Sequence, residues 1–500
     1  MVNLSAFIRF HAERTPDKAA VIYDDRSLAY AEMYNRIERV AAALAARGIG
    51  RGDVVAAVMK NSPAFLEIAF AASHLGAVFL PINFRLAADE VGYITDNAEA
   101  RLAFVDEEFT DVVPADLDHV ILDPDLQADA SDLDSTGAAV PSPSPCVPGD
   151  LQRLVYTSGT TDRPKGVMLS YENFYWKSMD LVMGLGIGAE DRLLVVGPLY
   201  HVGAFDLPGV AVLWAGGTLL VEREFDAGRA LDAIARHRLT GAWMAPTMLN
   251  ACLNLEGAGE RDLASLRWIV GGGERTPESR IRQFGEVFRA GRYVDAYGLT
   301  ESCSGDTLME AGREFEKIGS TGRALAHVEV EIANDDGNLL PPGTEGEIVL
   351  RGPKVTKGYW KDPAKTDAAF FDGWFRTGDI GYLDDDRFLY LTDRKKDMIL
   401  SGGENIASSE VERVIYELPH VLEAAVIGLP DAEWGERPVA VVVTKPGEQL
   451  DLETLREHCR AHLAAFKVPK ELHFAEALPR NPSGKVLKRQ LRENLASADD

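Results

Sequence analysis

An alternation of short apolar runs with helical patterns constrains the fold of this chain more than any other feature. Residues 53–59 (DVVAAVM) have the composition of a buried strand, residues 64–72 (AFLEIAFAA) that of the helix after it, and residues 77–81 (AVFLP) that of the next strand. The same rhythm recurs at 193–196, 218–221 and 268–270. Strands that alternate with helices are typical of α/β domains with parallel sheets. The sequence therefore predicts an α/β fold.

The length of the chain and a change in the pattern of predicted strands, helices and turns predict a division into domains. Five hundred residues are too many for one compact core. Between about 328 and 391, short strands separated by Gly, Pro and Asp indicate a small β-rich subdomain, and a new pattern begins after Asp393. We expect an N-terminal domain of residues 1–393, built from parallel-sheet α/β subdomains plus the β-rich subdomain. A small α+β C-terminal domain of residues 394–500 should follow it.

Composition and charge argue against several classes of protein. The chain holds 46% apolar and 26% charged residues, as globular proteins do. Its apolar runs stay below the roughly 18 residues that a membrane helix needs, and Arg9 and Glu13 interrupt the N-terminal segment before a signal-peptide core forms. Four cysteines without CxxC spacing favour a reducing compartment and no structural metal. A net charge of −26 argues against nucleic acid as a partner. We expect a cytoplasmic protein without an integral membrane segment.

A hydroxyl-rich loop after the apolar run 154–156 is a candidate phosphate site. Its sequence, TSGTTDRPKG at 157–166, combines hydroxyls, glycines and a lysine, which can surround phosphate with hydrogen-bond donors and one mobile positive charge. The spacing does not meet the Walker A pattern. The candidate binding residues are Thr157, Ser158, Gly159, Thr160, Thr161 and Lys165.

This loop resembles the phosphate-binding signature of the acyl-adenylate-forming enzymes, which include acyl-CoA synthetases, adenylation domains of peptide synthetases and beetle luciferases. The chain departs from the family at Asp162, where glycine is usual, and at Tyr171, where histidine is common. Aspartate tolerates left-handed backbone better than most residues, so the turn can survive. Its carboxylate near the phosphates could weaken ATP binding or alter the mobility of the loop.

Further motifs occur in the family's order. Residues 297–301 (YGLTE) resemble its Y-G-x-T-E element, which implies that Tyr297 stacks on adenine, Thr300 contacts the α-phosphate and Glu301 holds Mg²⁺. An oxygen ligand suits this hard cation. By the same resemblance Asp379 accepts the ribose hydroxyls and Arg394 also reaches the ribose. The adenine-side loop corresponds to Gly272, Gly273 and Glu274.

The C-terminal part carries two more matches. Residues 481–485 (NPSGK) resemble the element whose lysine, here Lys485, reaches the substrate carboxylate and the α-phosphate. Such a charge is worth roughly 10²–10³-fold in rate. Gly402 and Gly403 resemble the turn that lines the pantetheine tunnel of CoA ligases, although this chain continues Ala-Ser where the family has Tyr-Pro. Lys396 corresponds to the family's hinge residue.

The resemblance implies a two-step reaction with ATP, Mg²⁺ and CoA as co-substrate. A carboxylate attacks the α-phosphate of ATP, giving acyl-AMP and pyrophosphate, and the thiol of CoA then displaces AMP. Lys485 and a thiol tunnel cannot both face one acyl group in a static site. The resemblance therefore implies that the C-terminal domain is mobile and rotates about Lys396 between the steps.

The carboxylic acid substrate is the feature that the sequence determines least. Residues 198–205 (PLYHVGAF) resemble the element that borders the acyl pocket, and His201 could orient the carboxylate. Residues 243–247 and 299–303 should supply further walls, and these stretches show no lysine or arginine for a second carboxylate. A monocarboxylic apolar acid is therefore expected. The chain as a whole resembles bacterial fatty acyl-CoA ligases, which implies a medium- or long-chain fatty acid. An aryl or polycyclic acid, an acyl-AMP ligase that loads a carrier protein, a catalytically silent nucleotide-binding protein and a homodimer all stay open.

Overall fold

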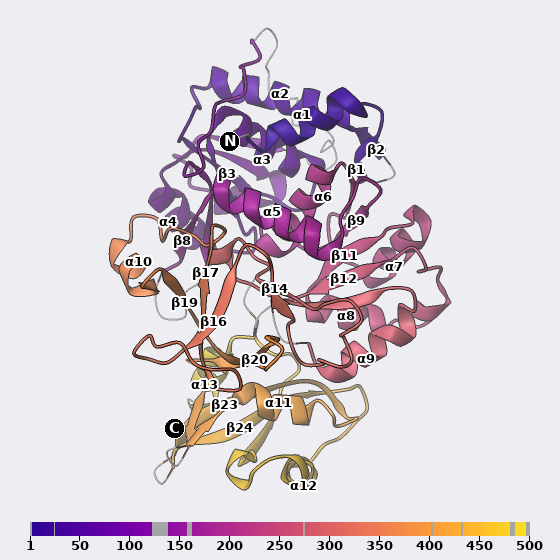
Figure 1. The fold of residues 1–500 in the computed structure, drawn as a ribbon, viewed down its shortest axis with the longest axis vertical. Helices are drawn as coiled ribbons and strands as arrows, with labels where there is room; N and C mark the ends of the chain where they lie inside the picture. Colours follow the sequence, from indigo (N-terminus) through magenta and orange to yellow (C-terminus); the bar gives the residue numbers. More distant parts are fainter. Residues whose placement is uncertain are drawn as a thin grey trace.

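The computed structural model describes residues 3–24, 26–122, 139–157, 163–273, 276–395, 397–401, 404–431, 434–480 and 486–496. The strands in these ranges form four sheets. Figure 1 shows the larger N-terminal part above and the C-terminal part below, next to β20 and α9. The predicted α/β class with a β-rich subdomain is confirmed.

The first α/β unit is a six-stranded sheet in the order β6-β5-β3-β4-β7-β8. Helix α3 (Pro63–Leu75) connects its central strands and starts where the Ser62 side chain accepts a hydrogen bond from the Phe65 amide. Every residue of α3 is buried, as expected for a largely apolar helix, and the buried set includes Glu67, Ser73 and His74. The strands are β3 (Val54–Val58), β4 (Val78–Ile82), β5 (Ala100–Asp106), β6 (His119–Leu122), β7 (Leu151–Thr157) and β8 (Lys165–Ser170).

The second unit is a nine-stranded sheet in the order β15-β14-β13-β12-β11-β9-β10-β1-β2. Its inner strands are parallel, so β12 and β13 end at the same edge. Ligands bind at such carboxyl ends in open α/β sheets. The strands are β1 (Ala19–Tyr23), β2 (Arg26–Ala29), β9 (Arg192–Val195), β10 (Thr218–Val221), β11 (Gly241–Met244), β12 (Trp268–Gly271), β13 (Arg292–Tyr297), β14 (Thr307–Leu308) and β15 (Arg323–Ala324).

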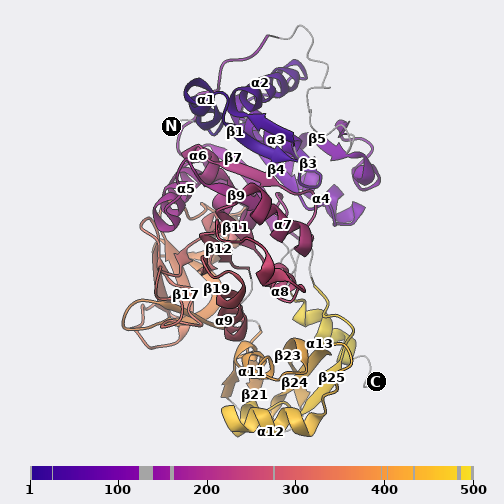
Figure 2. The ribbon, with the colours of Figure 1, turned by 90° about the vertical axis from the view of Figure 1, so that its right-hand side faces the viewer.

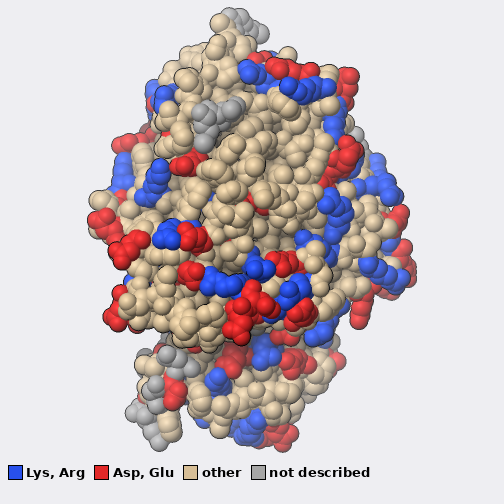
Figure 3. Space-filling view, in the orientation of Figure 1, with Lys and Arg blue, Asp and Glu red and all other residues tan. Residues whose placement is uncertain are grey.

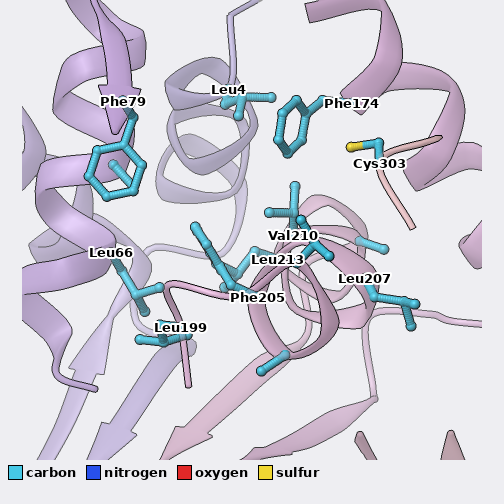
Figure 4. Close-up of a cluster of buried hydrophobic side chains, with 14 of the residues drawn as sticks. Leu4, Leu66, Phe79, Phe174, Leu199, Phe205, Leu207, Val210, Leu213 and Cys303 are labelled. Carbon is cyan, nitrogen blue, oxygen red and sulfur yellow. The ribbon is translucent and has the colours of Figure 1, made fainter. Parts of the chain in front are cut away.

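One continuous apolar core joins both sheets through α3, α5 and the π-helix η3 (Val202–Gly209). Figure 4 shows part of this core. The remaining helices of the N-terminal part are α1 (Ser5–Arg14), α2 (Tyr30–Ala46), α4 (Ala88–Ala98), α5 (Tyr171–Leu185), α6 (Val210–Ala215), α7 (Ala227–His237), α8 (Pro246–Leu253), α9 (Glu278–Val287) and α10 (Pro363–Ala369).

The β-rich subdomain is an antiparallel sheet whose last strand leads into the C-terminal part. It contains β16 (Glu329–Ala333), β17 (Gly346–Arg351), β18 (Phe370–Phe371), β19 (Trp374–Leu383) and β20 (Leu389–Arg394). The C-terminal part has its own sheet and its own apolar clusters, and Figure 2 shows it as a separate lobe. It contains β21 (Ile399–Ser401), β22 (Glu404–Ile406), α11 (Ser408–Ile415), β23 (Val421–Asp431), β24 (Gly435–Thr444), α12 (Leu452–His462), β25 (Glu471–Phe474) and α13 (Lys488–Ala496).

Basic and acidic side chains are interspersed on the face that Figure 3 draws. Among the described residues, no helix combines the length and the apolar character needed to cross a membrane.

Gly322 lies where β14, β15 and β20 meet, and we predict that Gly322→Ala destabilises the fold strongly. Its φ is +87°, and an added Cβ would lie 2.0 Å from the backbone of Leu308. Left-handed backbone and a backbone collision together should cost about 3 kcal/mol or more. Gly312 is the matched control, because its φ is +83° but nothing lies within 4 Å of its Cβ position. Denaturant unfolding should show a loss of only about 1–2 kcal/mol for Gly312→Ala. Equal losses would contradict this packing.

Candidate active site

Asp379 is held between two parts of the chain that are far apart in sequence. The Tyr297 hydroxyl, at the end of β13, donates to Asp379 Oδ2 at 2.9 Å. Arg394, which faces Asp379 across β19 and β20, places Nε 3.5 Å from Oδ1. Burial raises the pKa of Tyr297 well above its usual value, and the Asp379 carboxylate raises it further. The phenol therefore stays protonated and keeps donating to the carboxylate.

The backbone around Asp379 is fixed by its own hydrogen bonds. The Asp379 amide donates to Thr377 Oγ1 at 3.1 Å, and the Gly378 amide donates to Glu347 Oε1 at 3.1 Å. Gly378 has a φ of +73°, which glycine adopts without the strain of a side chain. The Lys395 amide donates to the Gly378 carbonyl. These contacts fix the direction in which the Asp379 carboxylate points.

Glu301, Tyr359 and Lys165 form a second polar group. Lys165 Nζ donates to the Tyr359 hydroxyl at 2.7 Å, and this hydroxyl donates to Glu301 Oε1 at 3.0 Å. Lys165 Nζ also lies 3.3 Å from Glu301 Oε1 and 4.1 Å from the centre of the Tyr359 ring. Burial raises the pKa of Tyr359, and the adjacent Glu301 raises it further. A buried carboxylate beside a mobile lysine can hold a hard cation and a phosphate together.

Three predicted residues lie near these groups. Thr300 starts the short 3₁₀ turn η5 (Thr300–Ser302), which carries Glu301. Thr157 ends β7 directly opposite Lys165 in β8, and its hydroxyl has no hydrogen-bond partner among the described residues. Gly272 follows β12, and a Cβ there would lie 3.1 Å from the Ala296 carbonyl oxygen of β13. The two strand ends therefore approach closely.

Gly273 comes next in the same loop. Its φ is +95°, and among the described residues outside its own chain neighbours no atom lies within 4 Å of its Cβ position. The backbone at this edge can therefore approach a ligand without a side chain in between.

His201 caps the π-helix η3, a type of helix that is frequent at functional sites. The Gly203 amide donates to His201 Nδ1 at 3.1 Å, which places the proton of a neutral imidazole on Nε2. The His201 and Trp243 ring centres are 6.2 Å apart. A Cβ on Gly203 would lie 2.5 Å from the Trp243 ring, so the glycine is needed for this packing.

The remaining predicted residues lie outside the part of the chain that the structure describes. They are Ser158, Gly159, Thr160, Thr161, Glu274, Lys396, Gly402, Gly403 and Lys485.

The structure adds residues that sequence reasoning missed. Tyr359 joins Lys165 to Glu301, although the stretch around it carries no recognisable signal. Lys177 of α5 lies fully buried close to Cys303, whereas the expected acyl walls contain no lysine or arginine. Arg153 and Asp206 are also buried. In the sequence, the only feature that marks Arg153 and Asp206 is that each is a charged residue within an apolar run.

Comparison with known proteins places this chain in a family. The family described as "AMP-binding enzyme" matches residues 8–360, and the "AMP-binding enzyme C-terminal domain" matches residues 410–485. The chain is 37% identical to a feruloyl-CoA synthase of an Amycolatopsis species, with 97% of both chains covered. It is also 37% identical to the long-chain-fatty-acid–CoA ligase FadD13 of Mycobacterium tuberculosis, with 99% of both covered.

A solved structure, that of ATP-bound MatB from Rhodopseudomonas palustris, covers 100% of both chains with a TM-score of 0.93 and 31% identity. The enzyme class expected from the sequence, an acid–thiol ligase, is confirmed at the level of the family. Both family domains and the fold agree. The chain therefore belongs to the AMP-binding enzyme family, the acyl-adenylate-forming superfamily that its motifs indicate.

Proposed function

We propose that this protein is an AMP-forming acyl-CoA ligase that converts a carboxylic acid, ATP and CoA into acyl-CoA, AMP and pyrophosphate through an acyl-adenylate. One observation carries the proposal. The 297–301 motif contributes one residue to each of two polar groups, and these two residues, Tyr297 and Glu301, are four positions apart. The first group is Tyr297–Asp379–Arg394 and the second is Lys165–Tyr359–Glu301. The first suits a ribose and the second suits a phosphate with its cation, so together they fit one Mg·ATP.

In the first step the acid is activated. Asp379 accepts hydrogen bonds from the ribose hydroxyls. Lys165 and the 157–161 loop offset the negative charge of the phosphates. Glu301 would supply a carboxylate oxygen to Mg²⁺. The bound cation would reduce the negative charge of the phosphates, which otherwise repels the approaching carboxylate of the acid. His201 donates from Nε2 to orient that carboxylate. Lys485 opposes the negative charge that develops as the acid attacks the α-phosphate and pyrophosphate leaves.

In the second step the thiol of CoA attacks the acyl carbon and AMP leaves. We infer that the part of the chain after Lys396 rotates as a unit about this residue, which removes Lys485 from the site and brings the Gly402–Gly403 turn to it. Arg394 ends β20 immediately before this hinge. Its contact with Asp379 therefore links the nucleotide to the position of the C-terminal domain.

The acid substrate is proposed as a medium- or long-chain fatty acid. An aryl acid is the second candidate, because the feruloyl-CoA synthase is as similar to this chain as the fatty-acid ligase is. An acid panel with ATP and Mg²⁺, with and without CoA, tests the proposal through pyrophosphate release and product mass. We expect a CoA-dependent thioester with one group of acids. Acyl-AMP without any thioester would mean a carrier-protein acceptor, and no pyrophosphate with any acid would overturn the proposal.

Glu301→Gln should impair activation of the acid through the metal. The amide cannot offer a charged oxygen to Mg²⁺, so pyrophosphate release should fall by about 10²-fold and need more Mg²⁺ for half-maximal rate. Glu316→Gln is the control, because Glu316 is 58% exposed and pairs only with Arg313 among the described contacts. If Glu301→Gln needs the same Mg²⁺ concentration as wild type for half-maximal pyrophosphate release, Glu301 is not the Mg²⁺ ligand.

Lys396→Pro should separate the two steps. Proline fixes φ and would restrict the hinge, so the variant should keep acid-dependent pyrophosphate release but lose thioester formation. Lys396→Ala removes the same side chain without restricting the backbone and should retain both. Equal loss of both steps in Lys396→Pro would show that residue 396 is not the hinge.

A further inference from the structure

The C-terminal lobe carries a pair of histidines that are spaced about one helical turn apart. His458 and His462 both belong to α12, and residues four apart lie on the same face of a helix. Their ring centres are 4.9 Å apart. Two histidines at this spacing in a helix can bind one zinc ion together.

A carboxylate from the neighbouring helix faces the histidine pair. α11 and α12 pack together through one apolar cluster, and Figure 2 shows both helices in the same lobe. Glu417 follows the end of α11 and places Oε2 3.8 Å from His458 Nε2. One ligand atom from each of Glu417, His458 and His462 lies within 4.8 Å of the other two. Within the described ranges, no other group of three His, Cys, Asp or Glu side chains meets this limit.

The distances suit a small tetrahedral ion after a slight closure of the side chains. Zinc binds histidine nitrogen and carboxylate oxygen at about 2.0–2.2 Å, so two of its ligand atoms are roughly 3.3–3.4 Å apart in a tetrahedral site. The Glu417 and His458 side chains are 42% and 23% exposed, and His462 is exposed as well. An ion can therefore reach the three groups from solvent, and side-chain rotation can bring them to it. Three protein ligands leave the fourth position to water.

The contacts already present around the three side chains are compatible with a metal. His458 Nε2 donates to the Val414 carbonyl at 3.0 Å, and metal binding through Nε2 would replace this hydrogen bond. The Val414 carbonyl also accepts from the Glu417 amide, so it would keep a donor. Arg413 Nη1 lies 3.5 Å from Oε1 of Glu417, which leaves Oε2 for the metal. Arg413 would then orient the carboxylate, as outer partners do at metal sites.

The set of ligands selects the kind of ion. Two imidazoles and one carboxylate suit Zn²⁺ and related transition metals, whereas Mg²⁺ prefers oxygen ligands in an octahedral arrangement. The adjacent thiol of Cys459 is fully buried in the apolar core of the lobe and is not one of the three ligands. The expectation that the chain has no structural metal rested on the spacing of its cysteines, which says nothing about a site of histidine and glutamate.

We propose that Glu417, His458 and His462 bind one divalent transition-metal ion, Zn²⁺ being the ion that their ligand atoms fit best, and that this ion fastens α11 to α12. None of the three residues belongs to the proposed active site. The proposal therefore does not depend on the proposed function.

Titration of the full chain with Zn²⁺, after purification without a histidine tag, tests the proposal. An excess of Mg²⁺ is present to occupy sites made of oxygen ligands, such as the one proposed at Glu301. Isothermal titration should show one Zn²⁺ per chain. His462→Gln and Glu417→Gln should each weaken this binding by at least about 10-fold, because even the loss of an outer partner of a ligand costs 10- to 100-fold in affinity.

His473→Gln and Glu448→Gln are matched controls in the same lobe. His473 Nε2 lies 3.2 Å from Glu471 Oε2, and His420 Nε2 lies 3.9 Å from Glu448 Oε2. Each is a pair of one histidine and one glutamate that has no second histidine within reach among the described residues. Both variants should bind Zn²⁺ as wild type does.

Zinc should also stabilise the helices that it joins. An ion that binds only the folded state shifts the folding equilibrium by about 100-fold at a free concentration of 100 times its Kd. Zn²⁺ should therefore raise the unfolding temperature of wild type and slow amide hydrogen exchange in α11 and α12. His462→Gln should unfold close to the wild-type temperature without metal, because His462 is exposed, and Zn²⁺ should not stabilise it.

Three results would overturn the proposal. The first is a wild-type chain that binds no Zn²⁺ in the presence of Mg²⁺, which is decisive without any variant. The second is equal Zn²⁺ affinity in wild type and both ligand variants, which would mean an adventitious ion bound elsewhere. The third is Zn²⁺ binding that leaves hydrogen exchange in α11 and α12 unchanged, which would show that the ion does not fasten the two helices.

Discussion

The contact of one carboxylate, that of Asp379, with Tyr297 and Arg394 joins the nine-stranded sheet to the β-rich subdomain at the point where the chain passes into the C-terminal lobe. Tyr297 ends a strand of the nine-stranded sheet, Asp379 belongs to the β-rich subdomain, and Arg394 ends the strand that leads into the C-terminal lobe. In the proposed function, a nucleotide bound to Asp379 would therefore lie where the two sheets meet, next to the start of the C-terminal lobe.

In this site, two residues that pair with each other in the structure are proposed to pair with parts of the ligand instead. Lys165 and Glu301 contact one another through Tyr359, so neither charge is buried alone before a ligand arrives. In the proposed reaction a phosphate takes the place of Glu301 on Lys165, and a cation takes the place of Lys165 on Glu301. The Glu301 side chain, which is 11% exposed, is then largely desolvated on folding, whereas the Lys165 side chain is 30% exposed. A carboxylate that is fixed before the ligand arrives is the preorganisation that electrostatic catalysis uses.

The strands and the local motifs could be predicted from the sequence, whereas the contacts between them could not. The runs at 193–196 and 268–270 are strands in the structure, with ends within one or two residues of the prediction. Residues 297–301 are contiguous, so one motif places several groups. Tyr359 lies 58 residues from Glu301, and the pairing depends on how the β-rich subdomain packs. Lys177 and Asp206 meet only because α5 and η3 pack together, which no periodicity encodes.

The affinity for AMP tests the central claim, that the strand-end site is a nucleotide site centred on Asp379. Isothermal titration would compare wild type with Asp379→Ala, and with Asp367→Ala as an exposed control on α10. Loss of hydrogen bonds from the ribose hydroxyls to a charged acceptor should weaken AMP binding by about 10- to 100-fold in Asp379→Ala. Asp367→Ala should bind AMP as wild type does. Wild-type affinity in Asp379→Ala, with an unchanged unfolding temperature, would contradict the account.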